Sequence, residues 1–372
     1  MSDSKIRICH VIGDLRPSGA ARSVCEMSRR LNRDRFDVRV LALRGGSAAQ
    51  WFQDAAIDVT DLEMTHPWRL LRLRGLSDQL RRLHPDIVHT HLYQADLAAR
   101  PAARLAAVPH LIHTARTPAG RFRPWEFAFT RFLAGYCDRL VCVSESVRQF
   151  HQRRSGLPEE KYALIPDGID IERFAPAPRL REAMRRQWGV DERQIVVGFV
   201  GRLNAQKGID TLLSAISHLG ARGNPVNVVI AGQGPRQAIV RNFIRYGEGG
   251  RSCRLLDFVD DVPALLNALD IMVLPSRWEA FGTAAAEAMA VGLPVIVSDT
   301  GHLRDLVAHR RTGILIDPGD SVALSETILE LAADAPLRQT LGAAAREHVR
   351  ATYPIEKTVA AHEALYEQVA GG

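Results

Sequence analysis

The chain has 372 residues, of which 46% are hydrophobic and 24% are charged, and its formal net charge at pH 7 is +6. This composition is that of an ordinary soluble globular protein with enough chain for two domain-sized cores. Its apolar runs, such as IVVGFV at 195–200, are far shorter than the roughly 18 residues of a membrane span, and the N-terminus MSDSKIR does not resemble a secretory signal. We therefore expect a cytoplasmic protein.

The cysteines argue against metal and disulfide roles. They are odd in number, they form no Cys-x-x-Cys pair, and three of them lie in or beside apolar stretches. The five are Cys9, Cys25, Cys137, Cys142 and Cys253. The pattern indicates reduced structural thiols.

The charge is distributed unevenly along the chain. Residues 1–175 hold 27 Lys and Arg against 20 Asp and Glu, whereas the remaining residues hold 21 against 22. A basic surplus of this kind suits nucleic acid, anionic lipid or a phosphorylated ligand, and it is equally typical of a solvated surface. The charge alone leaves these alternatives open.

Short apolar segments alternate with amphipathic helical stretches along the whole chain, which predicts an α/β fold. In the first half the expected strands are 6–12, 37–43, 86–92, 110–115 and 139–144. In the second half they are 195–201, 226–232, 270–276, 294–299 and 313–317. Several are apolar at consecutive positions, as parallel strands covered on both faces should be, so we expect two doubly wound sheets.

A stretch rich in Pro, Gly and Asp separates the two halves. Residues 166–180 read PDGIDIERFAPAPRL and lack clean periodicity. This composition suits a hinge between domains, and it predicts a boundary near residue 175.

Two basic residues follow the strand expected at 195–200. The segment GRLNAQKG at 201–208 places Arg202 and Lys207 at the carboxyl end of that strand, where open parallel sheets bind ligands. A guanidinium fork and a compact ammonium suit a diphosphate. A basic loop in water explains the pair equally well.

Two carboxylates lie in SRWEAFGTAAAEAMAVGLPV at 276–295. Glu279 is expected in a loop and Glu287 on a helix that starts at Thr283, a plausible N-cap. In this arrangement each carboxylate can accept hydrogen bonds from paired hydroxyls, one from a ribose and one from a sugar. The alternative is a solvated Glu279 and a Glu287 that merely pairs with an arginine.

Together these segments resemble glycosyltransferase family 4. The resemblance rests on GRLNAQKG, AGQGP (231–235), FVDDVPALLNALDIMVLPS (258–276), EAFGTAAAE (279–287) and EAMAVGLPVIVSD (287–299). It extends into the first half through HPDIVHTHL (84–92), LIHTAR (111–116), VCVSESV (141–147) and LIPDGID (164–170). The ordered set covers nearly the whole chain.

The resemblance implies a GT-B architecture, in which two Rossmann-like domains face each other across a cleft. The expected acceptor-side domain is 1–175, the donor-binding domain is 176–355, and a helix at 356–372 packs back toward the first domain. The implied activity is retaining transfer of a sugar from a UDP- or GDP-sugar to a glycan or lipid-linked acceptor, as in the assembly of cell-surface polysaccharide.

Site roles follow from the resemblance one residue at a time. Arg202 and Lys207 match the pair that holds the diphosphate, Glu287 the carboxylate on the ribose, and Glu279 the one that faces the donor sugar. Further matches are the backbone N–H groups of Phe281, Gly282 and Thr283, the glycine-loop position at Gly19, and His113 near the reacting sugar. The chain departs from the family pattern at RPSGAAR, which lacks a double glycine, and at Asp257, where many members have glycine.

The expected chemistry needs neither a metal nor another cofactor. Glycosyl transfer builds negative charge on the leaving diphosphate, and the two basic residues can stabilise it. The chain contains no Asp-x-Asp tripeptide and no obvious nucleophile for double displacement. We therefore favour front-face attack, in which the leaving phosphate takes the acceptor's proton.

Three other functions are compatible with two doubly wound domains. A nicotinamide dehydrogenase is disfavoured because no G-x-G-x-x-G follows the first strand, and GQGPRQ at 232–237 lacks the last glycine. A GT-B-type sugar-nucleotide epimerase and a non-catalytic protein that binds sugar nucleotides or glycans stay open.

A membrane contact is the hypothesis for ARTPAGRFRPWEFAFTRFLAGY at 115–136. There four arginines (Arg116, Arg121, Arg123 and Arg131) interleave with five aromatic rings (Phe122, Trp125, Phe127, Phe129 and Phe132). Such a segment can rest on an anionic membrane surface, which would place the protein at the inner face of the membrane near a lipid-linked acceptor. The alternative is an amphipathic helix whose rings pack on the sheet. No nucleic-acid partner is expected.

Overall fold

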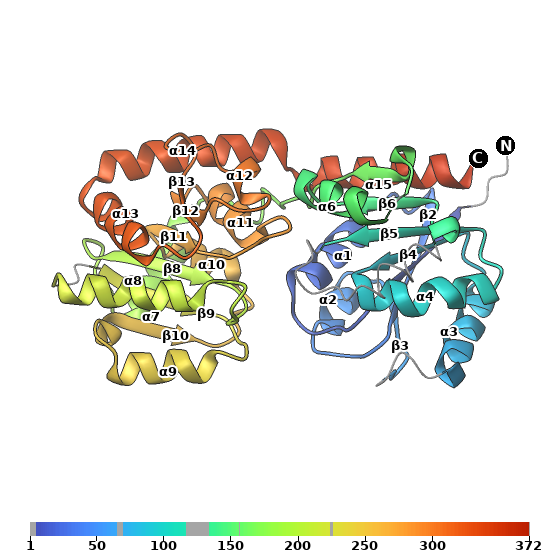
Figure 1. Ribbon diagram of the computed structural model, residues 1–372, viewed down its shortest axis with the longest axis horizontal. Helices are drawn as coiled ribbons and strands as arrows, with labels where there is room; N and C mark the ends of the chain where they lie inside the picture. The colour runs from blue at the N-terminus through green and yellow to red at the C-terminus, as the bar shows by residue number, and fades with distance from the viewer. Residues whose placement is uncertain (1–4, 65–69, 117–133, 156, 224–225, 372) are drawn as a thin grey trace. The chain divides into compact units, whose positions relative to one another are not determined.

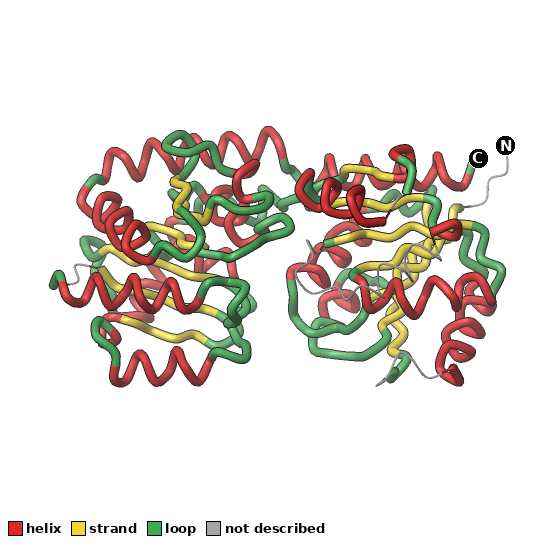
Figure 2. Tube along the Cα trace, in the orientation of Figure 1, coloured by secondary structure: helices red, strands yellow, loops and turns green. Residues whose placement is uncertain are grey.

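The computed structural model describes residues 5–64, 70–116, 134–155, 157–223 and 226–371. The chain divides into two compact units, one of Met1–Gly168 with Ile355–Gly372 and the other of Ile169–Pro354. Each unit is a parallel sheet with helices on its faces (Figures 1 and 2). The chain thus leaves the first unit at Gly168, seven residues before the expected boundary, and returns to it at Ile355.

The first unit holds seven parallel strands in the order β3-β2-β1-β4-β5-β6-β7. The strands are β1 (Ile6–Ile12), β2 (Phe36–Ala42), β3 (Asp58–Asp61), β4 (Ile87–His91), β5 (His110–Ala115), β6 (Arg139–Cys142) and β7 (Tyr162–Leu164). Its helices in the described part are α1 (Gly19–Arg30), α2 (Ala49–Asp54), α3 (Leu70–Leu83), α4 (Tyr93–Leu105), α6 (Glu145–Ser155) and α15 (Ile355–Ala370). Buried side chains of α15, including Val359 and Tyr366, share one core with Ile8 of β1 and Ile87 of β4.

The second unit holds six parallel strands in the order β10-β9-β8-β11-β12-β13. The strands are β8 (Ile195–Val200), β9 (Val226–Ala231), β10 (Cys253–Leu256), β11 (Ile271–Leu274), β12 (Val295–Ser298) and β13 (Ile314–Ile316). Its helices are α7 (Pro178–Trp188), α8 (Ile209–Ala221), α9 (Gln237–Tyr246), α10 (Val262–Asn267), α11 (Thr283–Val291), α12 (Leu303–Leu306), α13 (Ser321–Ala333) and α14 (Ala335–Thr352).

The fold class predicted from the sequence, two Rossmann-like α/β sheets, is confirmed, and so are all ten expected strands. The three strands that the sequence did not reveal, β3, β7 and β10, all lie at sheet edges. An edge strand is covered less completely, so it lacks the continuous apolar run by which a buried parallel strand is recognised. β3, for example, reads DVTD, and three of its four residues are exposed.

Strand order defines one point in each sheet where the connections change direction. In the first sheet it lies between β1 and β4, and in the second between β8 and β11. Ligands of open α/β sheets bind at the carboxyl ends of the strands beside such a point. The loops that follow these four strands are therefore the places to look for a site.

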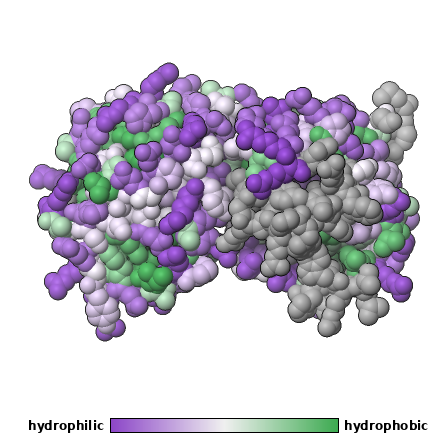
Figure 3. Space-filling model, viewed as in Figure 1, coloured by the Kyte–Doolittle hydropathy of each residue, from purple (hydrophilic) through white to green (hydrophobic). Residues whose placement is uncertain are grey.

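On the face of the second unit seen in Figure 3, most surface residues are polar. Polar side chains separate the apolar ones into small groups on the face seen in Figure 3. Scattered apolar side chains of this kind are normal on a protein surface. Within the described residues, no helix is long and apolar enough to cross a membrane.

Candidate active site

The two loops beside the switch point of the second sheet carry the predicted donor residues. The loop after β8 holds Arg202 and Lys207, and the loop after β11 holds Glu279. β8 and β11 are adjacent, with Val197 paired to Ile271, so both loops leave the same edge of the sheet. The topology thus brings together two segments more than 70 residues apart in the chain.

The side chains of Lys207 and Glu279 meet in an ion pair. Nζ of Lys207 lies 2.5 Å from Oε1 of Glu279, and the hydroxyl of Ser276 donates to the same oxygen at 2.7 Å. Glu279 is only 5% exposed, so the alternative of a solvated carboxylate is wrong. Its other oxygen, Oε2, bonds to no residue that the structure describes, which leaves it as an acceptor for a ligand's hydroxyl.

Two helices begin in these loops, and glycine precedes each of them. The N-cap of α8 is Gly208 (φ +67°) and that of α11 is Gly282 (φ +89°), and neither helix has a side-chain cap. The helices α10, α13 and α14 of the same unit are instead capped by aspartate side chains. The expected N-cap role of Thr283 is therefore wrong, because Thr283 is already the first helical residue. Uncapped N-termini keep their backbone N–H groups for an anion.

Gly208 also joins the two loops. A Cβ at this position would lie 1.8 Å from the carbonyl oxygen of Pro275, in the loop after β11. The backbone of Gly208 thus packs directly on that loop, which only glycine permits. The amide of Lys207 is held by the side chain of Asn204 at 3.0 Å, so the ammonium is presented from a defined turn.

The remaining donor candidates of the second unit differ in environment. Arg202 is exposed and has no ion-pair partner among the described residues, whereas Glu287 is half-buried on α11. Phe281 is buried, and its ring stacks on His302 at a centroid distance of 5.0 Å. Because its side chain is buried, Phe281 can offer a ligand only its backbone. Asp257 accepts a hydrogen bond from Gln237 and lies 3.3 Å from Arg241.

His113 lies in β5 of the first unit and is buried. Its Nδ1 is 2.8 Å from the hydroxyl of Thr90, on the neighbouring strand β4. Burial lowers the pKa of His113 below its usual value, so the ring is neutral at pH 7. His113 is thus a neutral histidine packed within the sheet, and its Nε2 bonds to no described residue.

Gly19 does not lie in a loop. It is the first residue of α1, and Ser18 caps that helix by accepting from the amide of Ala21 at 3.2 Å. The serine in RPSGAAR, which the family pattern did not point to, is therefore the capping residue. A serine directly before a helical stretch is the signal that could have identified it.

Most of the predicted membrane segment, residues 117–133, lies outside the described residues. Arg116 is described, and it does not belong to an exposed basic surface. Its guanidinium pairs with Asp167 and bonds to the hydroxyl of Ser23 at 2.9 Å. The hypothesis therefore loses one of its four arginines.

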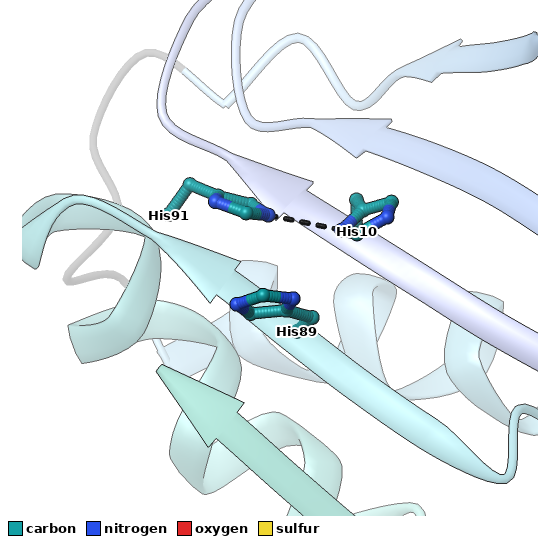
Figure 4. A group of neighbouring side chains, drawn as sticks. All are labelled: His10, His89 and His91. Atoms are coloured by element: carbon teal, nitrogen blue, oxygen red, sulfur yellow. Dashed lines mark hydrogen bonds between the residues drawn. The ribbon is translucent and has the colours of Figure 1, made fainter. Parts of the chain in front are cut away.

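Three buried histidines lie at the switch point of the first sheet (Figure 4). Nδ1 of His10 is 2.9 Å from Nε2 of His91, while His89 bonds to the hydroxyls of Tyr366 and Thr114, each at 2.7 Å. One nitrogen from each ring lies within 4.8 Å of the others. A metal ion would need a lone pair from all three rings, so the His10–His91 bond and one bond of His89 would first have to break. The arrangement is that of a hydrogen-bonded histidine network.

Models of known families match both halves of the chain. Residues 181–348 match the family described as glycosyl transferases group 1, and residues 17–173 match Glycosyltransferase Family 4. The match in the first half ends and the one in the second half begins within 13 residues after Gly168, where the chain leaves the first compact unit.

Relatives with assigned names match over most of the chain. The UDP-Gal:alpha-D-GlcNAc-diphosphoundecaprenol alpha-1,3-galactosyltransferase of Escherichia coli is 29% identical over 337 residues, which cover 85% of each chain. The D-inositol 3-phosphate glycosyltransferase of Geodermatophilus obscurus is 32% identical over 316 residues, which cover 77% of this chain and 68% of the relative.

Solved structures share the fold. HepE of Anabaena, in complex with UDP and glucose, matches with a TM-score of 0.87 at 22% identity, over 99% of this chain and 100% of HepE. The sucrose-phosphate synthase of Thermosynechococcus elongatus matches with a TM-score of 0.85 at 20% identity, over 99% and 100% of the two chains.

Proposed function

Because the chain belongs to glycosyltransferase family 4 and is therefore an enzyme that takes its sugar from a nucleotide-sugar donor, we propose that it transfers a hexose from a UDP-sugar with retention of configuration. The observation that carries this proposal is the Lys207–Glu279 pair beside the uncapped start of α11. A cation, an open carboxylate oxygen and free backbone N–H groups there suit a ligand that is anionic at one end and rich in hydroxyls at the other.

We assign each site residue to one part of that ligand. Lys207 and Arg202 stabilise the diphosphate, assisted by the backbone N–H groups of Phe281, Gly282 and Thr283. Oε2 of Glu279 accepts from hydroxyls of the donor sugar, since its Oε1 is already occupied by Lys207 and Ser276. Glu287 accepts from the ribose.

The reaction proceeds by front-face attack. The bond between the anomeric carbon and the diphosphate oxygen breaks, the acceptor oxygen bonds to that carbon from the same face, and the leaving phosphate takes the acceptor's proton. Negative charge grows on the diphosphate, where a fixed ammonium and helix N-termini stabilise it without reorganisation. Following the family resemblance, we assign His113 a contact with the sugar, which it makes as a neutral ring.

The donor nucleotide is tested by thermal unfolding with UDP, GDP and ADP sugars. We favour uridine because the galactosyltransferase of Escherichia coli is named for UDP-Gal and HepE was solved with UDP. A ligand at 100 times its Kd should add roughly 2.7 kcal/mol of stability. Stabilisation by GDP-glucose but not by UDP-glucose or UDP-galactose would refute the choice of base.

The proposed acceptor is a lipid-linked saccharide at the inner face of the membrane. In support, the relative from Escherichia coli is named for an acceptor carried on diphosphoundecaprenol. Residues 121–132 keep three arginines and five aromatic rings for a peripheral contact. Sedimentation with anionic vesicles should fall as salt rises, because the Debye length shortens from about 10 Å at 0.1 M to about 3 Å at 1 M. Equal pelleting with neutral vesicles would argue against the charge-based contact.

Product analysis separates the enzyme from its two open alternatives. With donor and acceptor, a transferase forms a new glycoside, whereas an epimerase isomerises the donor without any acceptor. A non-catalytic protein does neither. Glu287→Gln should lower transfer strongly while the chain stays folded, since Glu287 is half-buried. Wild-type transfer by this variant would contradict the ribose assignment.

A further inference from the structure

A continuous chain of hydrogen bonds leads to His113 from the interior of the first unit. His113 on β5 and Thr90 on β4 are register partners and point to the same face of the sheet. On that face, α4 places Asp96 with Oδ1 2.9 Å from the hydroxyl of Thr90. Arg100, one turn along α4, holds Oδ2 of Asp96 at 2.6 Å. All four residues are at most 5% exposed.

The chemistry of these groups decides where each proton lies. An ionised carboxylate only accepts, so the single proton of the Thr90 hydroxyl is donated to Asp96. The alternative acceptor, the carbonyl of Ile112, is farther away at 3.4 Å. The hydroxyl oxygen must then accept from His113. Nδ1 of His113 therefore carries the ring's proton, and Nε2 carries the lone pair.

The charge state of Asp96 agrees with this assignment. Burial acts to raise the pKa of Asp96, but the charge of Arg100 and the hydrogen bonds from Arg100 and Thr90 outweigh it and leave the pKa below its usual value. The carboxylate is thus ionised at neutral pH. If it were protonated, it could donate to Thr90 and the order of protons would reverse.

The turn that carries α4 is itself unusual. Leu92, between β4 and α4, has φ +68° and ψ 154°, a region that residues other than glycine seldom adopt. This conformation lets the chain leave β4 directly after His91 and start a helix whose first turn returns Asp96 to Thr90. Strained backbone of this kind clusters at functional sites.

We propose that Thr90 and Asp96 are positioning residues that hold His113 as the neutral Nδ1–H tautomer, so that Nε2 accepts a hydrogen bond from a hydroxyl of a sugar substrate. Arg100 holds Asp96 as an ionised acceptor, so the hydrogen bonds run from His113 to Thr90 and from Thr90 to Asp96. This inference rests on the proposed function only for its last step, the contact with sugar. The tautomer itself is a property of the ligand-free chain.

Two valine variants provide a matched test. Thr90→Val removes the hydroxyl next to His113 with little change in shape. Thr114→Val is the control, because Thr114 is equally buried and its hydroxyl also bonds to a histidine, His89 at 2.7 Å, but it takes no part in the relay. Thr90→Ser keeps the hydroxyl and should restore the wild-type state.

The full-length protein, labelled with ¹⁵N-histidine, reports the tautomer by NMR, and His113→Gln identifies the signal. Hydrolysis of UDP-glucose and UDP-galactose without acceptor gives the rate. We expect an Nδ1–H tautomer at His113 in wild type, in Thr90→Ser and in Thr114→Val. In Thr90→Val the Nε2–H form should appear, and kcat should fall roughly 10- to 100-fold.

The outcomes separate this inference from the proposed function. An unchanged Nδ1–H signal in Thr90→Val, or an equal loss of kcat in Thr114→Val, would overturn the positioning role. A His113→Gln variant with wild-type turnover would instead remove His113 from the proposed mechanism, whatever its tautomer.

Discussion

Lys207 and Glu279 form an ion pair at 2.5 Å although they lie in the loops after two different strands of the second sheet, β8 and β11. The pair is largely shielded from water, with side-chain exposures of 18% and 6%. In the proposed function, the pair supplies a cation to the diphosphate and a carboxylate to the sugar, and each charge offsets the other before the donor binds. Both activity and stability should therefore respond to its removal.

Lys207→Met should lower transfer by roughly 100-fold or more, because it removes a fixed cation from the leaving group. It should also cost about 1–3 kcal/mol of stability, since it leaves the buried carboxylate of Glu279 with Ser276 alone. Steady-state kinetics and urea unfolding measure the two effects. The double variant Lys207→Met with Glu279→Gln should regain stability but not activity. A double variant less stable than Lys207→Met would contradict the pairing argument.

Gly208→Ala should destabilise the second unit more than Gly189→Ala. Both glycines have φ +67° and ψ 32°, so the backbone cost of a side chain, about 1–2 kcal/mol, is common to both. A Cβ at Gly189 meets nothing within 4 Å, whereas one at Gly208 meets the carbonyl of Pro275. We expect an additional loss of about 1–3 kcal/mol in urea unfolding. Equal losses would show that the two loops are not in contact.

The first unit should lose stability as pH falls from about 6.5. Burial lowers the pKa of His10 to about 3 and that of His362 to about 4, and it holds those of His89 and His91 well below 6.5. The unfolded chain takes up protons at these rings below about 6.5 while the folded chain does not, so acid favours unfolding. Each ring contributes roughly 1.4 kcal/mol per pH unit over this window.

Hydrogen exchange checks this sign strand by strand. Protection of the amides in β1 and β4 should fall between pH 7 and pH 5 after correction for the intrinsic exchange rate. The strands β8 and β11 of the second unit serve as the internal reference. A parallel loss in both units would mean that the histidines are not responsible.

Transfer should continue in the presence of EDTA. The basic residues Arg202 and Lys207 and the uncapped helix starts supply the positive charge that a metal would otherwise bring to the diphosphate. The assay compares rates in EDTA with rates after addition of Mg²⁺ or Mn²⁺. Complete loss in EDTA that either ion restores would refute this account of the diphosphate site.

The amino-acid sequence determined the strands that are buried on both faces and the loops that follow them. Apolar runs such as 195–201 and 270–276 can be recognised as strands because nearly every side chain of a parallel strand covered on both faces is buried. The ordered motifs of the two halves were sufficient to identify the family. Local sequence also placed Lys207 and Glu279 in loops, because each of them lies between the end of an apolar run and a glycine.

Only the tertiary structure decided how these residues are paired. Whether Glu279 is solvated or buried depends on the strand order that brings β11 next to β8, and no local signal specifies that order. The same holds for Thr90, Asp96 and His113, whose bonds arise from the register of β4 against β5 and from the unusual turn at Leu92. Hydrogen bonds and ion pairs act over a few ångströms in space, whereas sequence patterns record only distance along the chain.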